Sequence, residues 1–310
     1  MSNLLQMQDL RKHLVSIIIP TCDRPRLLER AIRSVIKQNY LNFEIIVIDD
    51  SIKKPVDNVI KHLENDKIKY IKHAKRHRGP AGVRNVGIQA ARGDFVSFLD
   101  DDDEYLPNFL DTLVTILRNS ANAQMAIGKV MVHDGKGNNK LEAKIPKKEG
   151  FLRDLIPLPC YIFPNSFMLR RECIEFFDTL FPYYEDVDYV LRLAEKGIRY
   201  IYSDVPVAIR HDDSQINRVT DLTKRDIVIG ELLIRKHKEI LSENPFYYSD
   251  IIFNHVCKIY HYESGQRIIR FLRDALIASP FHLKHLFVFI FVFFLRTVKI
   301  VINKLLISNR

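Results

Sequence analysis

Short apolar runs alternate with helical patterns along the first hundred residues. Runs rich in Val and Ile predict strands at 15–19, 43–48, 68–71 and 95–99. Between them, apolar residues recur with helical spacing and predict helices at 26–38, 55–63 and 81–91. Continuous apolar strands separated by helices are typical of a parallel sheet that is covered on both faces. The pattern predicts an α/β fold with a mostly parallel central sheet, flanked by helices that form right-handed crossovers.

The pattern becomes irregular after residue 124. Strand-like stretches at 125–132, 167–169 and 199–207 are separated by loops, and a helix at 185–196 is ended by Gly197. Further helices are predicted at 220–241, 247–262, 266–278 and 281–306. We therefore expect a polar tail at 1–13, an α/β domain at 14–215 with halves at 14–105 and 106–215, a helical extension at 216–280 and a hydrophobic helix at 281–310.

Composition narrows the class of protein. The chain has 310 residues, 47% of them hydrophobic, and a net charge of +9, so it can bury a large core. Its four cysteines form no CxxC pair, which favours reduced thiols in a cytoplasmic protein. Residues 1–13 lack the apolar centre of a signal peptide. After Asp274 there are five basic residues and no acidic one.

This basic end of the chain is also strongly apolar, which favours lipid over nucleic acid as a partner. Residues 286–295 are all apolar, but the continuation to Leu306 includes Arg296, Lys299 and Lys304. A helix of this kind is typical of segments that lie in the membrane surface, with the basic side toward anionic headgroups. We expect 281–310 to attach the protein to the inner face of the cell membrane. The alternative is a buried helix in a homo-oligomer interface.

Four consecutive aspartates, Asp100 to Asp103, follow the apolar run 95–99 directly. Carboxylates this close repel one another unless water solvates them or a cation neutralises them. Hard cations such as Mg²⁺ and Mn²⁺ prefer oxygen ligands and often bridge carboxylates to substrate phosphates. The run predicts either such a metal site or a solvated acidic turn that caps the next helix.

Two other loops also follow predicted strands. Loop 20–24 contains Thr21, Asp23 and Arg24, and Asp49 with Asp50 ends the strand at 43–48. Ligands of open parallel sheets bind beyond the carboxyl ends of the strands. If the strand order is 3-2-1-4, these two loops and the aspartate run are neighbours in space.

Five segments in order resemble glycosyltransferase family 2, over roughly residues 14–212. They are VSIIIPT at 15–21, FEIIVIDDS at 43–51, GPAGVRNVGI at 79–88, FLDDDDEYLP at 98–107 and YEDVDYVLRL at 184–193. Each segment is weak alone, but the ordered set is specific. The resemblance implies the GT-A fold, a nucleoside-diphosphate-sugar donor bound mainly by 14–105, Mn²⁺ or Mg²⁺, and inversion at the anomeric carbon.

The resemblance also assigns roles to single residues. It places the nucleotide-sugar donor at Pro20, Thr21, Asp23, Arg24, Asp49, Asp50, Arg84, Asn85, Asp100 and Asp101. Asp102 matches the metal ligand of the DxD motif; because the run of four blurs the register, Asp100, Asp101 and Asp103 remain alternative ligands. Asp186 matches the catalytic base. His211 is either a further metal or phosphate contact or a surface histidine, and Arg84 is either a donor contact or solvated.

The resulting expectation is a metal-dependent inverting glycosyltransferase. It would move a sugar, from a UDP-sugar in the favoured case, to a hydroxyl of a glycan or lipid-linked acceptor in cell-surface polysaccharide synthesis. A sugar nucleotidyltransferase would need a Gly-rich loop after the first strand, and Thr21 to Arg24 contains no glycine. A catalytically inactive GT-A-like binding module is the other alternative, and the intact Asp50, Asp102 and Asp186 argue against it.

Overall fold

The computed structural model describes residues 13–54, 56–73, 79–134, 139–141, 145, 147–156, 162–212, 224–245, 248, 251, 273 and 277. The chain divides into two compact units, Met1–Val219 and Thr220–Arg310. The first unit contains a ten-stranded sheet. Eight of the strands follow the order β3-β2-β1-β4-β9-β6-β10-β5, and the other two, β7 and β8, pair with β6 and β10. The predicted α/β class is confirmed, and the first four strands have the order 3-2-1-4 that would make the three loops neighbours in space.

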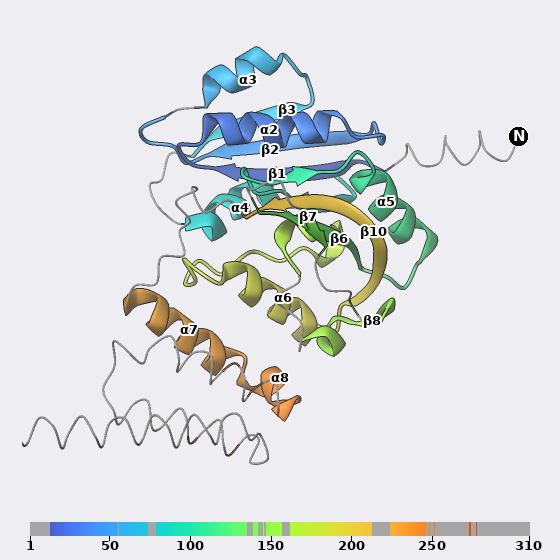
Figure 1. The fold of residues 1–310 in the computed structure, drawn as a ribbon, viewed down its shortest axis with the longest axis vertical. Helices are drawn as coiled ribbons and strands as arrows, with labels where there is room; N and C mark the ends of the chain where they lie inside the picture. The colour runs from blue at the N-terminus through green and yellow to red at the C-terminus, as the bar shows by residue number, and fades with distance from the viewer. Residues whose placement is uncertain are drawn as a thin grey trace, which may run out of the picture. The chain divides into compact units, whose positions relative to one another are not determined.

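The first half of the sheet is a set of parallel strands joined by helices (Figure 1). Its strands are β1 (Val15–Thr21), β2 (Phe43–Asp49), β3 (Ile68–Lys72) and β4 (Phe95–Phe98), and its helices are α2 (Pro25–Ile36), α3 (Asp57–Leu63) and α4 (Gly79–Ala90). In β1 and β2 the side chains alternate between the two faces of the sheet. Ile17, Ile19, Ile45 and Val47 belong to the core cluster that also contains Leu28 and Val35 of α2.

The opposite face of the same strands is covered by α4. Gly87 of α4 lies so close to the sheet that a Cβ atom would come within 2.4 Å of Ile18 Cγ2 and 2.8 Å of Ile48 Cδ1. Only glycine allows the helix backbone to approach to that distance. Helices α2 and α4 therefore lie on opposite faces of the sheet, as expected for strands that are buried on both sides.

The second half of the sheet mixes strand directions. Strand β9 (Phe167–Arg170) is antiparallel to both β4 and β6 (Met125–His133). Strand β10 (Arg199–His211) runs parallel to β6, with irregular register between Ser203 and Ala208, and curves along the sheet (Figure 1). It also pairs with β8 (Glu149–Phe151) and with the short β5 (Glu104–Tyr105), and β7 (Asn139–Leu141) pairs with β6. The last residue of β10, His211, is thereby brought beside the acidic turn.

Two helices complete this unit. Helix α5 (Phe109–Asn119) buries Leu110, Leu113, Val114 and Leu117 against the core, and the sequence analysis did not predict it. Helix α6 (Glu185–Glu195) ends as predicted at Gly197, whose φ of 72° lies in the left-handed region. Single turns of 3₁₀ helix lie at Leu152–Leu155, Pro164–Ser166 and Arg171–Cys173.

The second unit is described over α7 (Lys224–Lys236) and α8 (Lys238–Ser242). Where the sequence predicted one helix at 220–241, the structure has two, separated at the buried His237. The predicted helices at 247–262 and 266–278 are described at only a few positions, and 281–306 lies outside the described residues. Within the part of the chain that is described, none of the helices combines the length and the apolar character that a membrane crossing requires.

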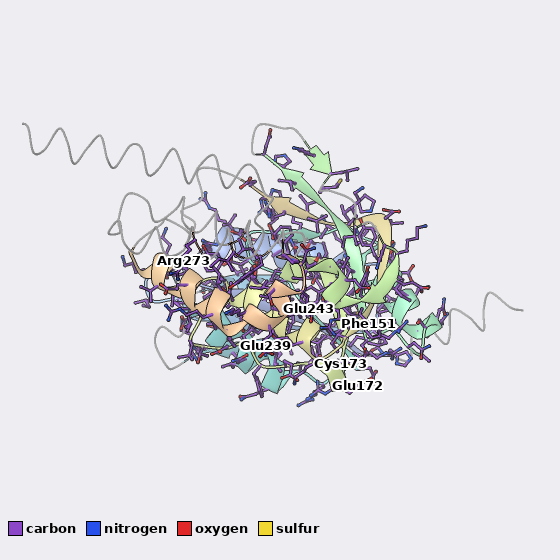
Figure 2. The ribbon with its side chains drawn as sticks, turned by 90° about the horizontal axis from the view of Figure 1, so that it is seen from below. Phe151, Glu172, Cys173, Glu239, Glu243 and Arg273 are labelled. Carbon is purple, nitrogen blue, oxygen red and sulfur yellow. The ribbon has the colours of Figure 1, made fainter. Side chains whose placement is uncertain are left out.

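Two of the cysteines are described, and both are free thiols. Cys22 is exposed in the loop after β1, and Cys173 is half-buried next to Glu172 (Figure 2). Burial raises the pKa of the Cys173 thiol, and the Glu172 carboxylate adds to that rise. A high thiol pKa makes this cysteine a poor nucleophile.

Candidate active site

The acidic turn begins where β4 ends. The Asp103 backbone N–H donates to Asp100 O over 3.1 Å, which closes a tight turn, and β5 follows at once. The Tyr105 hydroxyl, buried behind the turn, donates to Phe98 O over 2.8 Å. Two consecutive strands joined by a closed turn give the aspartates fixed positions.

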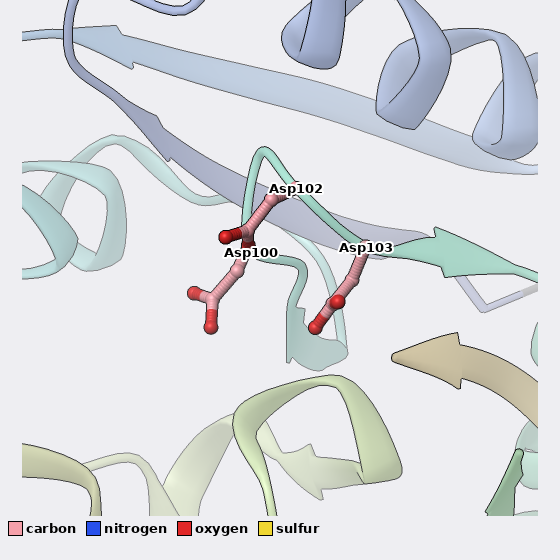
Figure 3. A group of neighbouring side chains, drawn as sticks. All are labelled: Asp100, Asp102 and Asp103. Carbon is pink, nitrogen blue, oxygen red and sulfur yellow. The ribbon is translucent and has the colours of Figure 1, made fainter. Parts of the chain in front are cut away.

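Three of the four aspartates converge. Asp100, Asp102 and Asp103 offer carboxylate oxygens that all lie within 4.8 Å of one another, and the three side chains leave the turn toward the same side (Figure 3). Asp103 is buried and held from two sides, by Asn165 Nδ2 at 2.7 Å and by the His211 backbone N–H at 3.0 Å. Burial raises the pKa of Asp103 well above its usual value, and Asp100 and Asp102 raise it further.

Asp101 is not one of the three converging carboxylates. Its Oδ2 accepts a hydrogen bond from Thr21 Oγ1 at 2.7 Å, and its Oδ1 lies 3.1 Å from Arg24 Nη1. The same guanidinium reaches Asp102 Oδ2 at 3.2 Å. Burial outweighs the effect of Arg24 and raises the pKa of Asp101 to about 7. Thr21 and Arg24 thus tie the loop after β1 to the acidic turn.

Arg84 connects the acidic turn to the N-terminus of α6. Its Nη2 donates to Asp100 Oδ1 at 2.6 Å and its Nη1 to Glu185 Oε1 at 2.7 Å. The Arg84 side chain is only 4% exposed, which excludes the solvated alternative. One buried guanidinium therefore holds two carboxylates from segments 85 residues apart in the chain.

Asp186 lies at the start of α6, next to Glu185. Tyr184, which precedes the helix, has a φ of 62°, a value that costs a non-glycine residue energy and that recurs at functional sites. Burial raises the pKa of Glu185 to about 7 and also raises the pKa of Asp186, in both cases against the lowering effect of Arg84. The structure therefore gathers Asp100, Glu185 and Asp186 around a single positive charge.

The loops after β1 and β2 are locked to one another by Asp23. Asp23 Oδ1 accepts three backbone hydrogen bonds, from Ile52, Lys53 and Lys54, at 3.1, 2.7 and 2.6 Å. Although burial acts to raise the pKa of Asp23, these N–H groups outweigh it and lower the pKa. The Asp23 side chain is directed at the loop after β2. Asp23 would therefore affect a bound nucleotide through the shape of that loop.

Asp49 and Asp50 take different partners. Asp49 is fully buried and accepts hydrogen bonds from Lys72 Nζ and the Tyr70 hydroxyl, each at 2.8 Å. Burial opposes ionisation of Asp49, but the hydrogen bonds from Lys72 and Ser51 prevail and lower its pKa. Asp50 lies 3.0 Å from His73 Nδ1, and its side chain is 11% exposed. Asp49 thus holds the end of the strand, while Asp50 contacts the residue that follows β3, the strand at the edge of the sheet.

Three other predicted residues occupy secondary positions. Pro20 lies within β1, in register with Ile48 of β2. Both polar atoms of the Asn85 amide bond the backbone of Phe177, at 2.7 and 2.8 Å, so Asn85 fastens the segment before α6. His211 Nε2 lies 2.8 Å from Glu104 Oε1, and this bond lowers the pKa of Glu104. The His211 ring is therefore directed to Glu104, and its backbone supports Asp103.

The chemistry of the converging carboxylates fits a divalent cation. Three carboxylates, one of them buried, repel one another, and a hard cation would remove that repulsion while finding the oxygen ligands it prefers. The buried Asn165 Oδ1, beside Asp103, has no hydrogen-bond partner among the described residues. Asp100, Asp102 and Asp103 are the residues that would hold the ion.

The comparison with known families identifies the family to which the protein belongs. The family model described as Glycosyl transferase family 2 matches residues 16–177, just over half of the chain. The chain belongs to glycosyltransferase family 2.

Named relatives of this family 2 enzyme share parts of its sequence. A GalNAc(5)-diNAcBac-PP-undecaprenol beta-1,3-glucosyltransferase of Campylobacter jejuni is 43% identical over 102 residues, which cover 32% of this chain and 33% of the relative. The UDP-Glc:alpha-D-GlcNAc-diphosphoundecaprenol beta-1,3-glucosyltransferase WfgD of Escherichia coli is 28% identical over 182 residues, 59% of this chain and 69% of the relative. The chain thus matches only a third of the length of the Campylobacter enzyme.

The fold is also similar to that of a solved structure. TarS of S. aureus, residues 1–349, in complex with UDP-GlcNAc, superposes with a TM-score of 0.65 at 17% identity, covering 86% of this chain and 81% of TarS. The predicted GT-A architecture is confirmed by this likeness. The family assignment supports the glycosyltransferase class that the sequence predicted.

Several residues at the site of this family 2 enzyme were missed by the sequence analysis. Asn165 and His73 contact predicted site residues but lie outside the five motif segments, in loops with no distinguishing pattern. Glu185 and Glu104 were quoted within motifs without a role. The sequence did contain a signal for Glu185. Two adjacent acidic residues at the start of a helix, Glu185 and Asp186, could have been expected to pair with an arginine.

Proposed function

We propose that the protein is a metal-dependent, inverting glycosyltransferase that uses a nucleoside-diphosphate sugar, with UDP favoured as the nucleotide. The observation that carries the proposal is the position of Arg84. It holds Asp100, one of the three converging carboxylates, and Glu185, the neighbour of the candidate base Asp186, within hydrogen-bond distance of one guanidinium. Arg84 thus connects Asp100, a proposed ligand of the cation, to the residue next to Asp186, the proposed proton acceptor.

The donor would lie across the carboxyl ends of β1, β2 and β4. The loop closed by Asp23 and the side chain of Asp50, supported by His73, would bind the nucleotide base. Asp100, Asp102 and Asp103 would hold Mn²⁺ or Mg²⁺ beside the diphosphate. When bound, such a cation would neutralise the negative charge that grows on the leaving diphosphate.

Asp186 would accept the proton of the acceptor hydroxyl as that hydroxyl attacks the anomeric carbon. A carboxylate whose pKa is raised by burial holds a transferred proton more readily than a solvated one does. Arg84 and the N-terminus of α6 would keep Asp186 ionised before the reaction. Attack from the face opposite the leaving group inverts the anomeric configuration.

The acceptor is proposed from the relatives. Two of them are named for transfer to glycans carried on diphosphoundecaprenol. We infer that this chain also extends a glycan or lipid-linked acceptor in the synthesis of a cell-surface polysaccharide. The proposed membrane attachment through 281–310 would bring the enzyme to such an acceptor, although that segment lies outside the described residues.

A two-stage experiment tests the proposed function. Thermal shift with a panel of nucleoside diphosphates and their sugars, with and without Mn²⁺, identifies the donor, because a ligand that binds the folded state raises Tm. The donor found is then incubated with sugar-diphosphate-polyprenol acceptors, and the anomeric configuration of the product is read by NMR. We expect a Mn²⁺-dependent rise in Tm with a UDP-sugar, and a product inverted relative to the donor. Retention of configuration, or release of a nucleotide sugar from NTP and sugar phosphate, would contradict the proposal.

A further inference from the structure

A basic groove runs along α2, separate from the converging carboxylates. A cavity of about 440 Å³ lies between α2 and the segment 104–107, and Arg26, Arg30, Arg33 and Lys37 all contribute to its lining. Their spacing of four, three and four residues places them on one face of the helix. We call this cavity the α2 groove.

The acidic residues in the lining are already paired. Glu29 binds Arg33 at 2.7 Å, and Glu104 lies 3.4 Å from Arg30 Nε and 2.8 Å from His211 Nε2. Within the part of the chain that the structure describes, the side chains of Arg26 and Lys37 form no salt bridge, and both are exposed. The α2 groove therefore carries an excess of positive charge, with four cations and two carboxylates in its lining.

Helix stability explains cations at the C-terminal end of α2 but does not explain the position of Arg26. The first turn of α2 contains no acidic residue, and Arg26 adds positive charge to the end of the helix that is already positively polarised. A partner that supplies negative charge would remove this unfavourable interaction. The spacing of the four cations indicates the shape of that partner.

The four cations extend over twelve residues, a rise of about 16 Å along the helix axis, with neighbours about 5–6 Å apart. A single diphosphate reaches only one pair of them, whereas the headgroups of a lipid surface present phosphates along the whole length. We propose that the α2 groove docks on the phosphate headgroups of an anionic membrane surface. Arg30 Nη2 also donates to the Asp102 backbone carbonyl at 2.5 Å, so docking would place the acidic turn directly behind the membrane-facing helix.

Docking through α2 requires neither glycosyl transfer nor the segment 281–310, so it is tested by binding alone. The full chain is sedimented with vesicles of phosphatidylcholine containing phosphatidylglycerol, in EDTA and at limiting lipid. Each basic residue near such a surface contributes roughly fivefold in binding, so Arg26→Gln/Lys37→Gln lowers the partition coefficient by roughly 25-fold. Arg26→Lys/Lys37→Arg, which keeps both charges, retains wild-type binding.

A charge-matched control separates the groove from net charge. Lys61→Gln/Lys140→Gln removes two exposed lysines outside the groove and should change the partition coefficient far less. Equal losses in the two double variants would show that only overall charge matters and would overturn the proposal. Unchanged binding in Arg26→Gln/Lys37→Gln would also overturn the proposal.

A spectroscopic measurement reports the docked face directly, since the chain contains no tryptophan. Asn39 is exposed and its backbone N–H bonds Pro107 O beside the groove, whereas Gln89 is exposed on α4, on the opposite face of the sheet. On vesicles containing brominated phosphatidylglycerol, the fluorescence of Asn39→Trp should be quenched and that of Gln89→Trp should not. Equal quenching, or quenching of Gln89→Trp alone, would contradict docking through α2.

Discussion

Thr21 Oγ1 donates a hydrogen bond to Asp101 Oδ2 over 2.7 Å, and Asp101 is the one of the four consecutive aspartates that does not belong to the converging group. With Asp101 held by the loop after β1, Asp100 and Asp102 face the same side of the turn, together with Asp103. The structure thus favours Asp100-x-Asp102 as the register of the DxD motif, with Asp103 as a buried third carboxylate.

The register can be tested by metal affinity. Asp102→Asn should weaken Mn²⁺ binding by at least about tenfold, because even the loss of a group that only supports a metal ligand has an effect of this size. Asp101→Asn should change the Mn²⁺ dissociation constant little, because the amide oxygen still accepts the bond from Thr21. Titration followed by the EPR signal of free Mn²⁺ measures both constants, and equal weakening in the two variants would refute the register.

Asp186 is expected to matter for turnover and not for donor binding. Asp186→Asn removes the proton acceptor and should lower kcat by roughly 10²–10⁴-fold, while calorimetry shows an unchanged donor affinity. Asp188→Asn is the matched control on the same helix. Asp188 is fully buried and accepts a bond from Arg192 Nε at 2.8 Å, so its replacement should lower Tm and leave kcat near that of the wild type. Substantial residual turnover in Asp186→Asn would rule out its role as the base.

The buried Glu185 makes folding stability depend on pH. Its pKa is raised from 4.5 to about 7, so between these values the native state binds more protons than the unfolded state, and the free energy of unfolding falls as pH rises. Urea denaturation in EDTA at pH 5 and pH 8 should show Glu185→Gln losing less stability across this range than the wild type, by on the order of 1–3 kcal/mol. Glu195→Gln, at the exposed C-terminal end of α6, should keep the slope of the wild type, and an unchanged slope in Glu185→Gln would contradict the expectation.

Asp23 should affect donor affinity through the loop that it holds. Asp23→Ala leaves the N–H groups of Ile52, Lys53 and Lys54 without their acceptor, and hydrogen bonds to a charged group are strong enough that the donor KM should rise roughly tenfold. The value of kcat should stay close to that of the wild type, because the reacting groups are untouched. Asp57→Ala, which removes only an exposed pair with Lys61, is the control, and a loss confined to kcat would show that Asp23 acts elsewhere.

Much of the fold could be predicted because buried parallel strands leave a clear pattern. The runs at 15–19 and 43–48 contain no charged residue except Glu44, and their short length and their Val and Ile content favour a strand buried on both faces. Helix α5 could have been predicted too, since Leu110, Leu113, Val114 and Leu117 follow helical spacing.

The site was less predictable for a physical reason. Four identical aspartates carry no pattern, so their directions depend on partners far away in the sequence: Thr21 for Asp101, Arg84 for Asp100 and Asn165 for Asp103. The burial of Arg84 and the rotation of Asn85 toward Phe177 likewise depend on tertiary packing. Local sequence gives the type of residue at the site, and long-range contacts give its orientation.

The dependence of the transfer rate on Mn²⁺ tests the central claim most directly. Chelation should abolish transfer by the wild-type enzyme and added Mn²⁺ should restore it, whereas Asp102→Asn should remain inactive at Mn²⁺ concentrations that saturate the wild type. Transfer that continues at full rate in EDTA, or an Asp102→Asn enzyme that responds to Mn²⁺ as the wild type does, would contradict the account.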